Sequence, residues 1–269
     1  MEKKIKKSQD SLARRLNELK DDVYERFLET YLALLSLNAD DNLKWSTENL
    51  NKIKRIDDLF DDRLTQTLLA WMASEVTALS VSALDSFKKR GFEVKPEIVT
   101  RIERQIGWAG GKIVRGGYLD TLGRMDSVKL QLKNYVMTAI ANGEEVKKFI
   151  SDFKEILKGD SSIIERYYET YAYDTFAKVV RTTDLHVAEE LGLKHFIYQG
   201  GLIETSRQFC IKKDGLAFRK DQAEEWRTDP DLPGIDTHPD YNPLIDCGRW
   251  RCRHWLEWIT EEEYLKLNQ

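Results

Sequence analysis

The sequence has only three cysteines among 269 residues, and it lacks both a secretion signal and a long apolar run. An odd number of cysteines, all in the last quarter of the chain, does not build the even disulfide framework of a small secreted domain. The charged N-terminus has no apolar core of the kind that directs secretion, and no run approaches the roughly 18 apolar residues of a membrane-spanning helix. We therefore expect a protein made in a reducing cytoplasm, with no membrane partner.

A strong excess of charge of one sign is also lacking, because the formal net charge is only -4 although 33% of the residues are charged. Together with 41% hydrophobic residues, this balance is typical of a well-solvated globular protein and indicates no nucleic-acid partner. A small cluster of lysines stands near the N-terminus: Lys3, Lys4, Lys6 and Lys7. Lysines at a chain end more often solvate the protein than bind phosphate, so we favour solvation.

No proline or glycine interrupts residues 5–37, where apolar residues recur in alternating steps of three and four. This spacing predicts one long amphipathic helix, and packing inside the protein is favoured over a coiled coil with another subunit. Similar patterns with capping residues predict helices at about 46–60, 63–90, 96–106, 126–141 and 144–157. A last long helix is expected from a cap at Gly159-Asp160-Ser161 to about Leu191, with Tyr168 and Tyr171 on its apolar stripe.

Six glycines crowd into residues 107–123. Their spacing is not that of a phosphate-binding loop, because no Gly-x-x-x-x-Gly-Lys-Ser/Thr motif is present and no clear strand leads into the segment. We therefore predict a flexible connection or a close helix contact there.

After Gly192 the helical pattern gives way to short segments. Residues 195–199, 215–218 and 255–259 are expected to form strands, and residues 220–226 a short helix. The predicted fold class is mainly α, with an elongated multi-helix body and a small α+β C-terminal module. We divide the chain into an N-terminal helical region (1–124), a central helical region (125–192) and the small α+β cysteine-containing module (193–269), which is called the C-terminal module below.

Thiolates and imidazoles are the preferred ligands of tetrahedral zinc, and the C-terminal module contains three cysteines and a histidine that could form such a set. These residues are Cys210, Cys247, Cys252 and His254. Their spacing is not that of a paired-knuckle site, because Cys210 stands alone far upstream of the others. We favour buried thiols without a metal, while bound zinc and a Cys210–Cys247 disulfide stay open as alternatives.

The same stretch contains the residue types of two other kinds of site. A nucleophilic thiolate needs a nearby base, and Cys252 and His254 stand two residues apart with Asp246 available, but we expect no catalytic residue. Arginines alternate with aromatic residues over 249–255, a pattern that can stack on bases. Because acidic residues nearly match the arginines in number, we favour internal ion pairs with arginines packed on tryptophans.

Six short segments follow one another in the last third of the chain. They are Arg181-Thr182-Thr183-Asp184, Phe196-Ile197-Tyr198, Glu204-Thr205-Ser206-Arg207-Gln208-Phe209-Cys210, Gly215-Leu216-Ala217-Phe218, Tyr241-Asn242-Pro243 and Cys247-Gly248-Arg249-Trp250-Arg251-Cys252-Arg253-His254. Their order resembles that of the phage Mu F-like minor head proteins, also called phage head morphogenesis proteins. The resemblance covers roughly residues 143–259.

The resemblance implies a structural minor head protein of a tailed bacteriophage, made in the host cytoplasm and carried in the virion. Its expected partners are phage portal or capsid proteins and packaged DNA, and its role would lie in capsid assembly, DNA packaging or ejection. No enzymatic turnover is implied. The residues expected to hold the C-terminal module together are Arg181, Arg207, Cys210, Cys247, Cys252 and His254. A zinc-stabilised nucleic-acid-binding protein and a toxin-like hydrolase are the competing interpretations.

Overall fold

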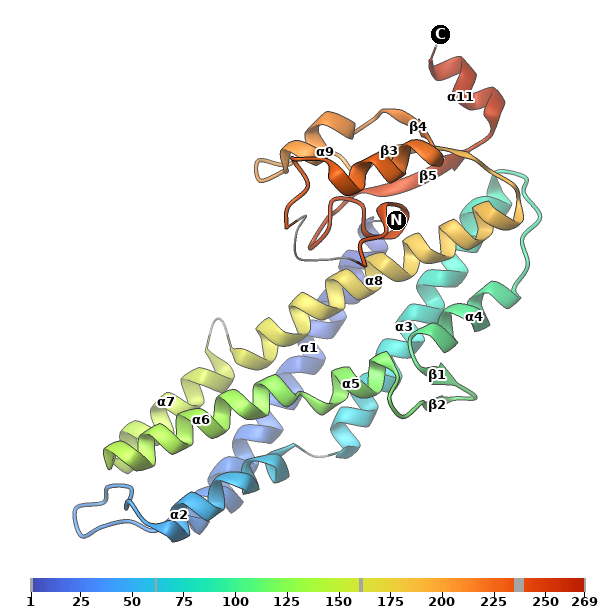
Figure 1. The fold of residues 1–269 in the computed structure, drawn as a ribbon. Helices are drawn as coiled ribbons and strands as arrows, with labels where there is room; N and C mark the ends of the chain where they lie inside the picture. Colours follow the sequence, from blue (N-terminus) through green and yellow to red (C-terminus); the bar gives the residue numbers. More distant parts are fainter. Residues whose placement is uncertain (1, 61, 160–161, 235–239, 269) are drawn as a thin grey trace. The chain divides into compact units, whose positions relative to one another are not determined.

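The computed structural model describes residues 2–60, 62–159, 162–234 and 240–268. These residues are mainly helical, and a small antiparallel sheet lies in the C-terminal module (Figure 1). The predicted fold class, mainly α with a small α+β C-terminal module, is confirmed.

Two compact units make up the chain, and neither is one continuous segment. The helical unit consists of Ser8–Met72 and Gly110–Tyr171. The terminal unit consists of Ala73–Ala109, the chain from Ala172 onward, and the N-terminal residues through Lys7. The three consecutive regions drawn from the sequence describe order along the chain, and as domains they stay a prediction.

Three long helices contribute residues to both units: α1 (Glu2–Arg26), α3 (Asp62–Lys89) and α8 (Ile163–Glu190). The amphipathic pattern of residues 5–37 forms α1, followed by a π-helical turn at Phe27–Tyr31 and a 3-10 turn at Leu32–Leu34. Thus the predicted helix is present, and only its end departs from α geometry. Helix α3 ends at Lys89, and Gly91 shortly after it has a φ of +87°, which glycine adopts without strain.

The remaining elements of the helical unit are short helices and one hairpin strand. They are α2 (Thr47–Lys52), a 3-10 helix at Ile53–Leu59, β2 (Lys112–Ile113), α5 (Tyr118–Arg124), α6 (Asp126–Asn142) and α7 (Val146–Lys158). The hydroxyl of Ser46 accepts a hydrogen bond from the Asn49 amide at 3.1 Å, which caps α2 as expected. A Cβ at Gly123 would lie 2.4 Å from Leu69 Cδ1, so the predicted close helix contact is confirmed.

An aromatic cluster forms the core of the helical unit. The ring of Phe27 stacks on Phe153 with centroids 3.7 Å apart, and its edge contacts Phe149 at 5.5 Å. Tyr135 of α6 stacks on Phe149 and donates its hydroxyl to the Phe149 carbonyl at 3.1 Å. These contacts hold α1, α6 and α7 together.

The terminal unit adds α4 (Glu97–Gln105) after Pro96 and β1 (Trp108–Ala109). The residues of the C-terminal module form β3 (His195–Gln199), α9 (Gln208–Lys213), β4 (Ala217–Arg219), a 3-10 helix at Asp221–Thr228, α10 (Pro243–Asp246), β5 (Trp255–Ile259) and α11 (Glu261–Leu267). The sheet order is β4-β3-β5, and both pairings are antiparallel, with Phe196 opposite Phe218 on one side and Trp258 on the other. All three predicted strands are present, whereas α9, α10 and α11 were not expected.

Part of the expected cap of α8 lies outside the described residues, namely Asp160 and Ser161. The side chain of Tyr171 also lies outside them. The next residue, Ser162, accepts a hydrogen bond from the Glu165 amide at 3.2 Å, and Tyr168 is fully buried. Of the two tyrosines expected on the apolar stripe of α8, Tyr168 is therefore a core residue.

One helical stretch, Thr47–Lys89, is long and apolar enough to cross a membrane by length and composition alone. Half of its most apolar window is buried inside the protein, as is usual for a core helix, so the finding is weak evidence for a membrane partner. The expected absence of a membrane partner therefore stays a prediction.

We predict that Phe27→Ala lowers the free energy of unfolding by about 3–5 kcal/mol, because it leaves a cavity inside the aromatic cluster. The neighbouring Leu28 is 39% exposed, and Leu28→Ala serves as the matched control with a change of about 0.5 kcal/mol or less. Urea unfolding followed by circular dichroism measures both. Equal losses in the two variants would contradict the assignment of the core.

Candidate metal centre

Two cysteines and one histidine from distant parts of the C-terminal module meet in its interior. Cys210 lies on α9, while Cys252 and His254 lie in the loop before β5. The two sulfur atoms are 3.9 Å apart, and Cys252 Sγ lies 3.8 Å from Nδ1 of His254. We call Cys210, Cys252 and His254 the thiol–imidazole cluster; its ligand atoms all lie within 4.8 Å of one another. This buried cluster could hold a metal ion.

Cys247 is not part of the thiol–imidazole cluster, so the set of three cysteines and one histidine expected from the sequence is reduced to two cysteines and one histidine. All three cysteines are buried and none takes part in a disulfide, so the alternative of a Cys210–Cys247 disulfide is not realised. The main chain of Cys247 instead takes part in the loop, where its carbonyl accepts a hydrogen bond from the Tyr241 hydroxyl at 2.6 Å.

The loop that supplies Cys252 has an unusual backbone. Cys247, Arg249 and Arg251 have φ values of 49°, 68° and 53°, a left-handed region that non-glycine residues rarely adopt. Such residues cost of order 1–3 kcal/mol each, and they persist only where the surroundings determine the conformation. The contacts around this loop must therefore be strong.

Arginine side chains supply those contacts. Arg181 of α8 donates to the carbonyl of His254 at 2.9 Å and also to the carbonyls of Ile245 and Cys252, at 3.2 and 2.5 Å. Its side chain is almost fully buried. Charge-assisted hydrogen bonds of this kind are stronger than neutral ones. We call these three bonds the Arg181 clamp.

Two further arginines bind the same loop region. Arg207 donates to the carbonyls of Gly248 and Trp250, at 3.0 and 2.5 Å. Arg249 donates to the carbonyls of Pro233 and Gly234, and its guanidinium lies 5.0 Å from the Trp250 ring centre. The expectation that arginines pack on tryptophans holds for Arg249. Arg207 and Arg249 do not follow the expectation of internal ion pairs, because their hydrogen bonds go to backbone carbonyl oxygens.

Two glycines leave room for the thiol–imidazole cluster. A Cβ at Gly248 would lie 2.6 Å from Cys210 Sγ and 3.1 Å from Cys252 Sγ. A Cβ at Gly200 would lie 2.6 Å from Cα of His254. The Gly248 amide also donates to Cys252 Sγ at 3.2 Å. Close backbone approach therefore packs these glycines against the cluster.

The pKa values of the two thiols in the cluster shift in opposite directions. The pKa of the Cys252 thiol is lowered well below its ordinary value, first by the thiol of Cys210 donating to it and then by His254 and Arg181, although burial opposes the shift. The pKa of Cys210 is raised because Cys252 accepts its proton and because it is buried. Burial also raises the pKa of Cys247 to about 12. Of the two thiols in the cluster, that of Cys252 is thus the more acidic.

His254 is oriented by groups on both sides of its ring. Its Nε2 lies 3.2 Å from Oδ1 of Asp214, and this buried nitrogen makes no hydrogen bond. The ring also stacks on Tyr198 with centroids 4.7 Å apart. Ligating histidines commonly direct their second nitrogen at a carboxylate, so this arrangement suits a metal ligand.

The order Cys252, His254, Asp214 is also that of a catalytic triad. Cys252 and His254 are only 2% and 3% exposed, however, which leaves a substrate no surface on which to approach the sulfur. Asp246, the acid named from the sequence, instead pairs with Lys178 at 2.7 Å. The geometry therefore favours metal binding over nucleophilic catalysis.

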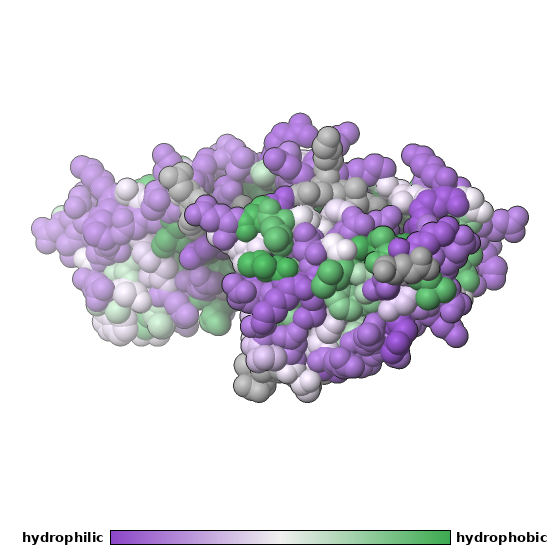
Figure 2. Space-filling view, turned by 90° about the horizontal axis from the view of Figure 1, so that it is seen from above, coloured by the Kyte–Doolittle hydropathy of each residue, from purple (hydrophilic) through white to green (hydrophobic). Residues whose placement is uncertain are grey.

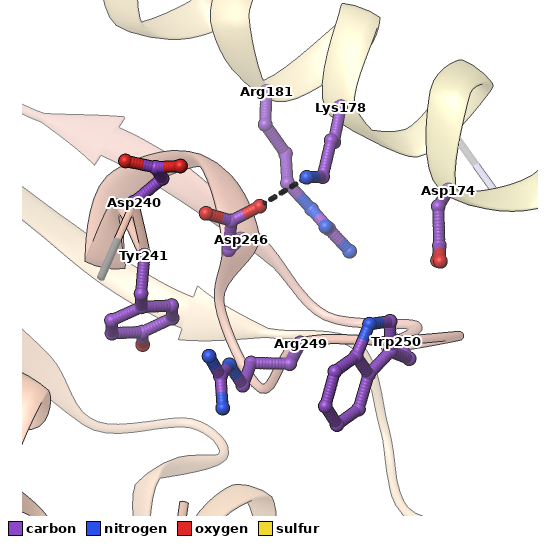
Figure 3. A pocket seen from close by; sticks show the side chains of 8 residues that line it. All are labelled: Asp174, Lys178, Arg181, Asp240, Tyr241, Asp246, Arg249 and Trp250. Atoms are coloured by element: carbon purple, nitrogen blue, oxygen red, sulfur yellow. Dashed lines mark ion pairs between the residues drawn. The ribbon is translucent and has the colours of Figure 1, made fainter. Parts of the chain in front are cut away.

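A small cavity of about 120 Å³ lies beside the Arg181 clamp (Figure 3). Its charged lining consists of Lys178, Arg181, Arg249, Asp174, Asp240 and Asp246. Asp174 accepts a hydrogen bond from the Arg251 amide at 2.8 Å, and burial raises the pKa of its carboxyl group. The three positive and three negative side chains balance one another, so the cavity favours neither an anionic nor a cationic ligand.

The structure brings together Arg181, Arg207, Cys210, Cys252 and His254 of the six residues expected to hold the module. Cys247 is not one of the ligand atoms of the cluster, although its thiol lies close enough to Cys252 and Tyr198 to affect their pKa values. Sequence reasoning missed Tyr198, Asp214 and the packing glycines. Alternation along the strand 195–199 was the available signal for Tyr198, because it places Tyr198 on the same buried face as Phe196.

Comparison of the chain with protein-family models, curated proteins and solved structures finds no match. Inference about function therefore rests on the residues and their geometry.

We predict that Arg181→Lys lowers the free energy of unfolding by more than about 2 kcal/mol, because one ammonium group cannot serve three carbonyl groups fixed in different directions. Arg166→Lys, at an exposed position on the same helix, is the matched control and should change little. Guanidinium chloride unfolding monitored by tryptophan fluorescence compares the two. If both variants were as stable as the wild type, the Arg181 clamp would not matter for the fold.

Proposed function

We propose that this chain is a structural minor head protein of a tailed bacteriophage, made in the host cytoplasm and incorporated into the virion. In this role it binds portal or capsid proteins during head assembly, and it contacts packaged DNA during packaging or ejection. It acts by binding and carries out no turnover.

One observation carries the proposal: the segments that resemble the phage head morphogenesis proteins contact one another. Arg181 of the first segment binds carbonyls of the last, and Arg207 of the third segment does the same. Phe196 of the second packs against Phe218 of the fourth, with ring centroids 6.0 Å apart. Tyr241 of the fifth donates to the carbonyl of Cys247 in the last. An order found along the chain thus corresponds to one packed structure.

The surface of the C-terminal module supports a docking role. Most of the surface in Figure 2 is hydrophilic, with small groups of apolar residues among it. The exposed apolar side chains of the module include Leu202, Ile203, Ile211 and Leu216, each 42–52% exposed. Covering apolar side chains of this kind removes them from water and therefore stabilises a complex with a partner. We propose that portal or coat subunits cover these residues.

We further propose that the metal held by the thiol–imidazole cluster is zinc, bound to stabilise the module. Thiolate and imidazole are its preferred ligands, and two sulfur atoms on one tetrahedral zinc stand about 3.8 Å apart when each Zn–S bond is about 2.3 Å. The observed separation is 3.9 Å. Bound zinc would thus add to the contacts that hold α9 to the loop before β5.

A zinc-stabilised nucleic-acid-binding protein is the second candidate. Trp250 is 42% exposed beside the guanidinium of Arg249, an arrangement that can stack on a base. This candidate requires DNA affinity that falls steeply with salt, because binding releases counterions from the phosphates. The balanced charges of the neighbouring cavity make it the weaker candidate.

The virion assignment is tested by quantitative mass spectrometry of phage particles purified by density gradient from a producing strain. We expect peptides of this chain in the particles at a low ratio to the major coat protein, and also in the producing cells. Detection in the cells but not in the particles would overturn the assignment. A filter-binding titration with DNA at several salt concentrations is the parallel test of the second candidate.

The docking surface is tested with the double variant Leu202→Ser/Leu216→Ser. Because both side chains are about half exposed, we expect unchanged folding but at least about tenfold less protein in the particles, since about 1.4 kcal/mol of binding corresponds to a factor of ten. Leu265→Ser/Leu267→Ser, on the exposed face of α11, is the matched control. Normal incorporation of the first variant would exclude these leucines from the contact.

A further inference from the structure

Tyr198 of β3 points its hydroxyl group at the thiol–imidazole cluster. The side chain is completely buried, and its Oη lies 3.4 Å from Cys210 Sγ and 3.6 Å from Cys252 Sγ. Both neighbours are sulfur atoms, which are weak hydrogen-bond partners for a buried phenol. A buried hydroxyl normally finds a stronger acceptor, so the position of Tyr198 calls for another explanation.

The distances around Tyr198 match those between ligands of one tetrahedral ion. Zinc bonds of about 2.3 Å to sulfur and about 2.0 Å to oxygen place the two ligand atoms about 3.5 Å apart. The observed Oη–Sγ distances of 3.4 and 3.6 Å lie on either side of this value. The same geometry gives about 3.6 Å between sulfur and an imidazole nitrogen. Cys252 Sγ and His254 Nδ1 are 3.8 Å apart.

The ring of His254 shares this arrangement with Tyr198. The two rings stack with an interplanar angle of 16°, while Nδ1 of His254 lies near the Cys252 sulfur. Asp214 lies on the opposite side of the imidazole, near Nε2. Four donor atoms therefore gather from β3, α9 and the loop before β5, and an outer carboxylate is positioned to orient the histidine.

We propose that the Tyr198 phenolate is the fourth ligand of the metal, which gives zinc or a similar divalent cation a closed site of two cysteines, one histidine and one tyrosine. The inference rests on the zinc assignment proposed above. On binding, the thiols of Cys210 and Cys252 and the hydroxyl of Tyr198 release their protons to solvent, so that all three bind as anions. Two thiolates and one phenolate carry three negative charges, so the site with a divalent cation has a net charge of −1. The buried guanidinium of Arg181, bound to the carbonyls of Cys252 and His254, balances that charge.

A closed site has a functional consequence. Structural zinc sites fill all four positions with protein ligands, whereas catalytic sites keep one position for water or substrate. With Tyr198 as a ligand, the cation has no open position and serves only to hold β3, α9 and the loop before β5 together. This agrees with a protein that acts by docking.

The test compares Tyr198→Phe with Tyr241→Phe in the full chain. Each variant removes one hydroxyl from a buried tyrosine of the module and keeps its ring; the Tyr241 hydroxyl binds the Cys247 carbonyl, away from the cluster. Zinc affinity is measured by competition with a chromophoric chelator, and coordination by the visible spectrum of the cobalt-substituted protein. We expect Tyr198→Phe to lose more than about tenfold in affinity, since even the loss of an outer partner costs about 10–100-fold. Its cobalt spectrum should change, whereas Tyr241→Phe should match the wild type.

A measurement on the wild type covers the case in which Tyr198→Phe fails to fold. Titration of the metal-free protein with zinc should produce the ultraviolet difference spectrum of one ionised tyrosine per chain. Zinc binding without this signal, or with unchanged affinity and cobalt spectrum in Tyr198→Phe, would overturn the role of Tyr198 and leave the zinc assignment intact. Failure of the wild type to bind zinc would overturn both, and detection of the chain in phage particles is independent of either result.

Discussion

The fold of the C-terminal module depends on one buried cation, the guanidinium of Arg181. It reaches from α8 to three carbonyl groups, those of Ile245, Cys252 and His254. A buried carbonyl without a partner costs about 1–3 kcal/mol, so these bonds offset a large desolvation cost in one place. They also fix the loop from which Cys252 and His254 point inward.

The strained backbone of this loop follows from the same constraint. Left-handed φ values at Cys247, Arg249 and Arg251 turn the chain so that its carbonyls face arginines and its sulfur atoms face the core. Gly248 then approaches both Cys210 and Cys252 so closely that no side chain fits. The loop before β5 is thus held in one conformation by Arg181 and Arg207 on its outer side and by the packing of Gly248 against two sulfur atoms on its inner side. If a partner bound the exposed surface proposed for docking, a module held in this way would lose little conformational freedom.

The sequence predicted regular elements much better than the site. The strands at 195–199 and 255–259 were found at their actual bounds, because short apolar runs between turn residues are a strong local signal. Helix α10 was missed because it spans only four residues. Contact between Cys210 and Cys252 joins positions 42 residues apart, which no local pattern specifies. The left-handed backbone conformation of Arg249 and Arg251 could not be expected either, because non-glycine residues rarely adopt positive φ values. Function stays a proposal from resemblance and geometry.

The most direct test of the account is elemental analysis of the native protein purified without added metal, together with Cys252→Ser and Cys247→Ser. Cys247 and Cys252 are both buried, but only Cys252 belongs to the thiol–imidazole cluster. The account predicts about one zinc per chain in the wild type and in Cys247→Ser, and little or none in Cys252→Ser. A wild-type protein that is folded and free of zinc, or equal zinc content in all three proteins, would contradict it.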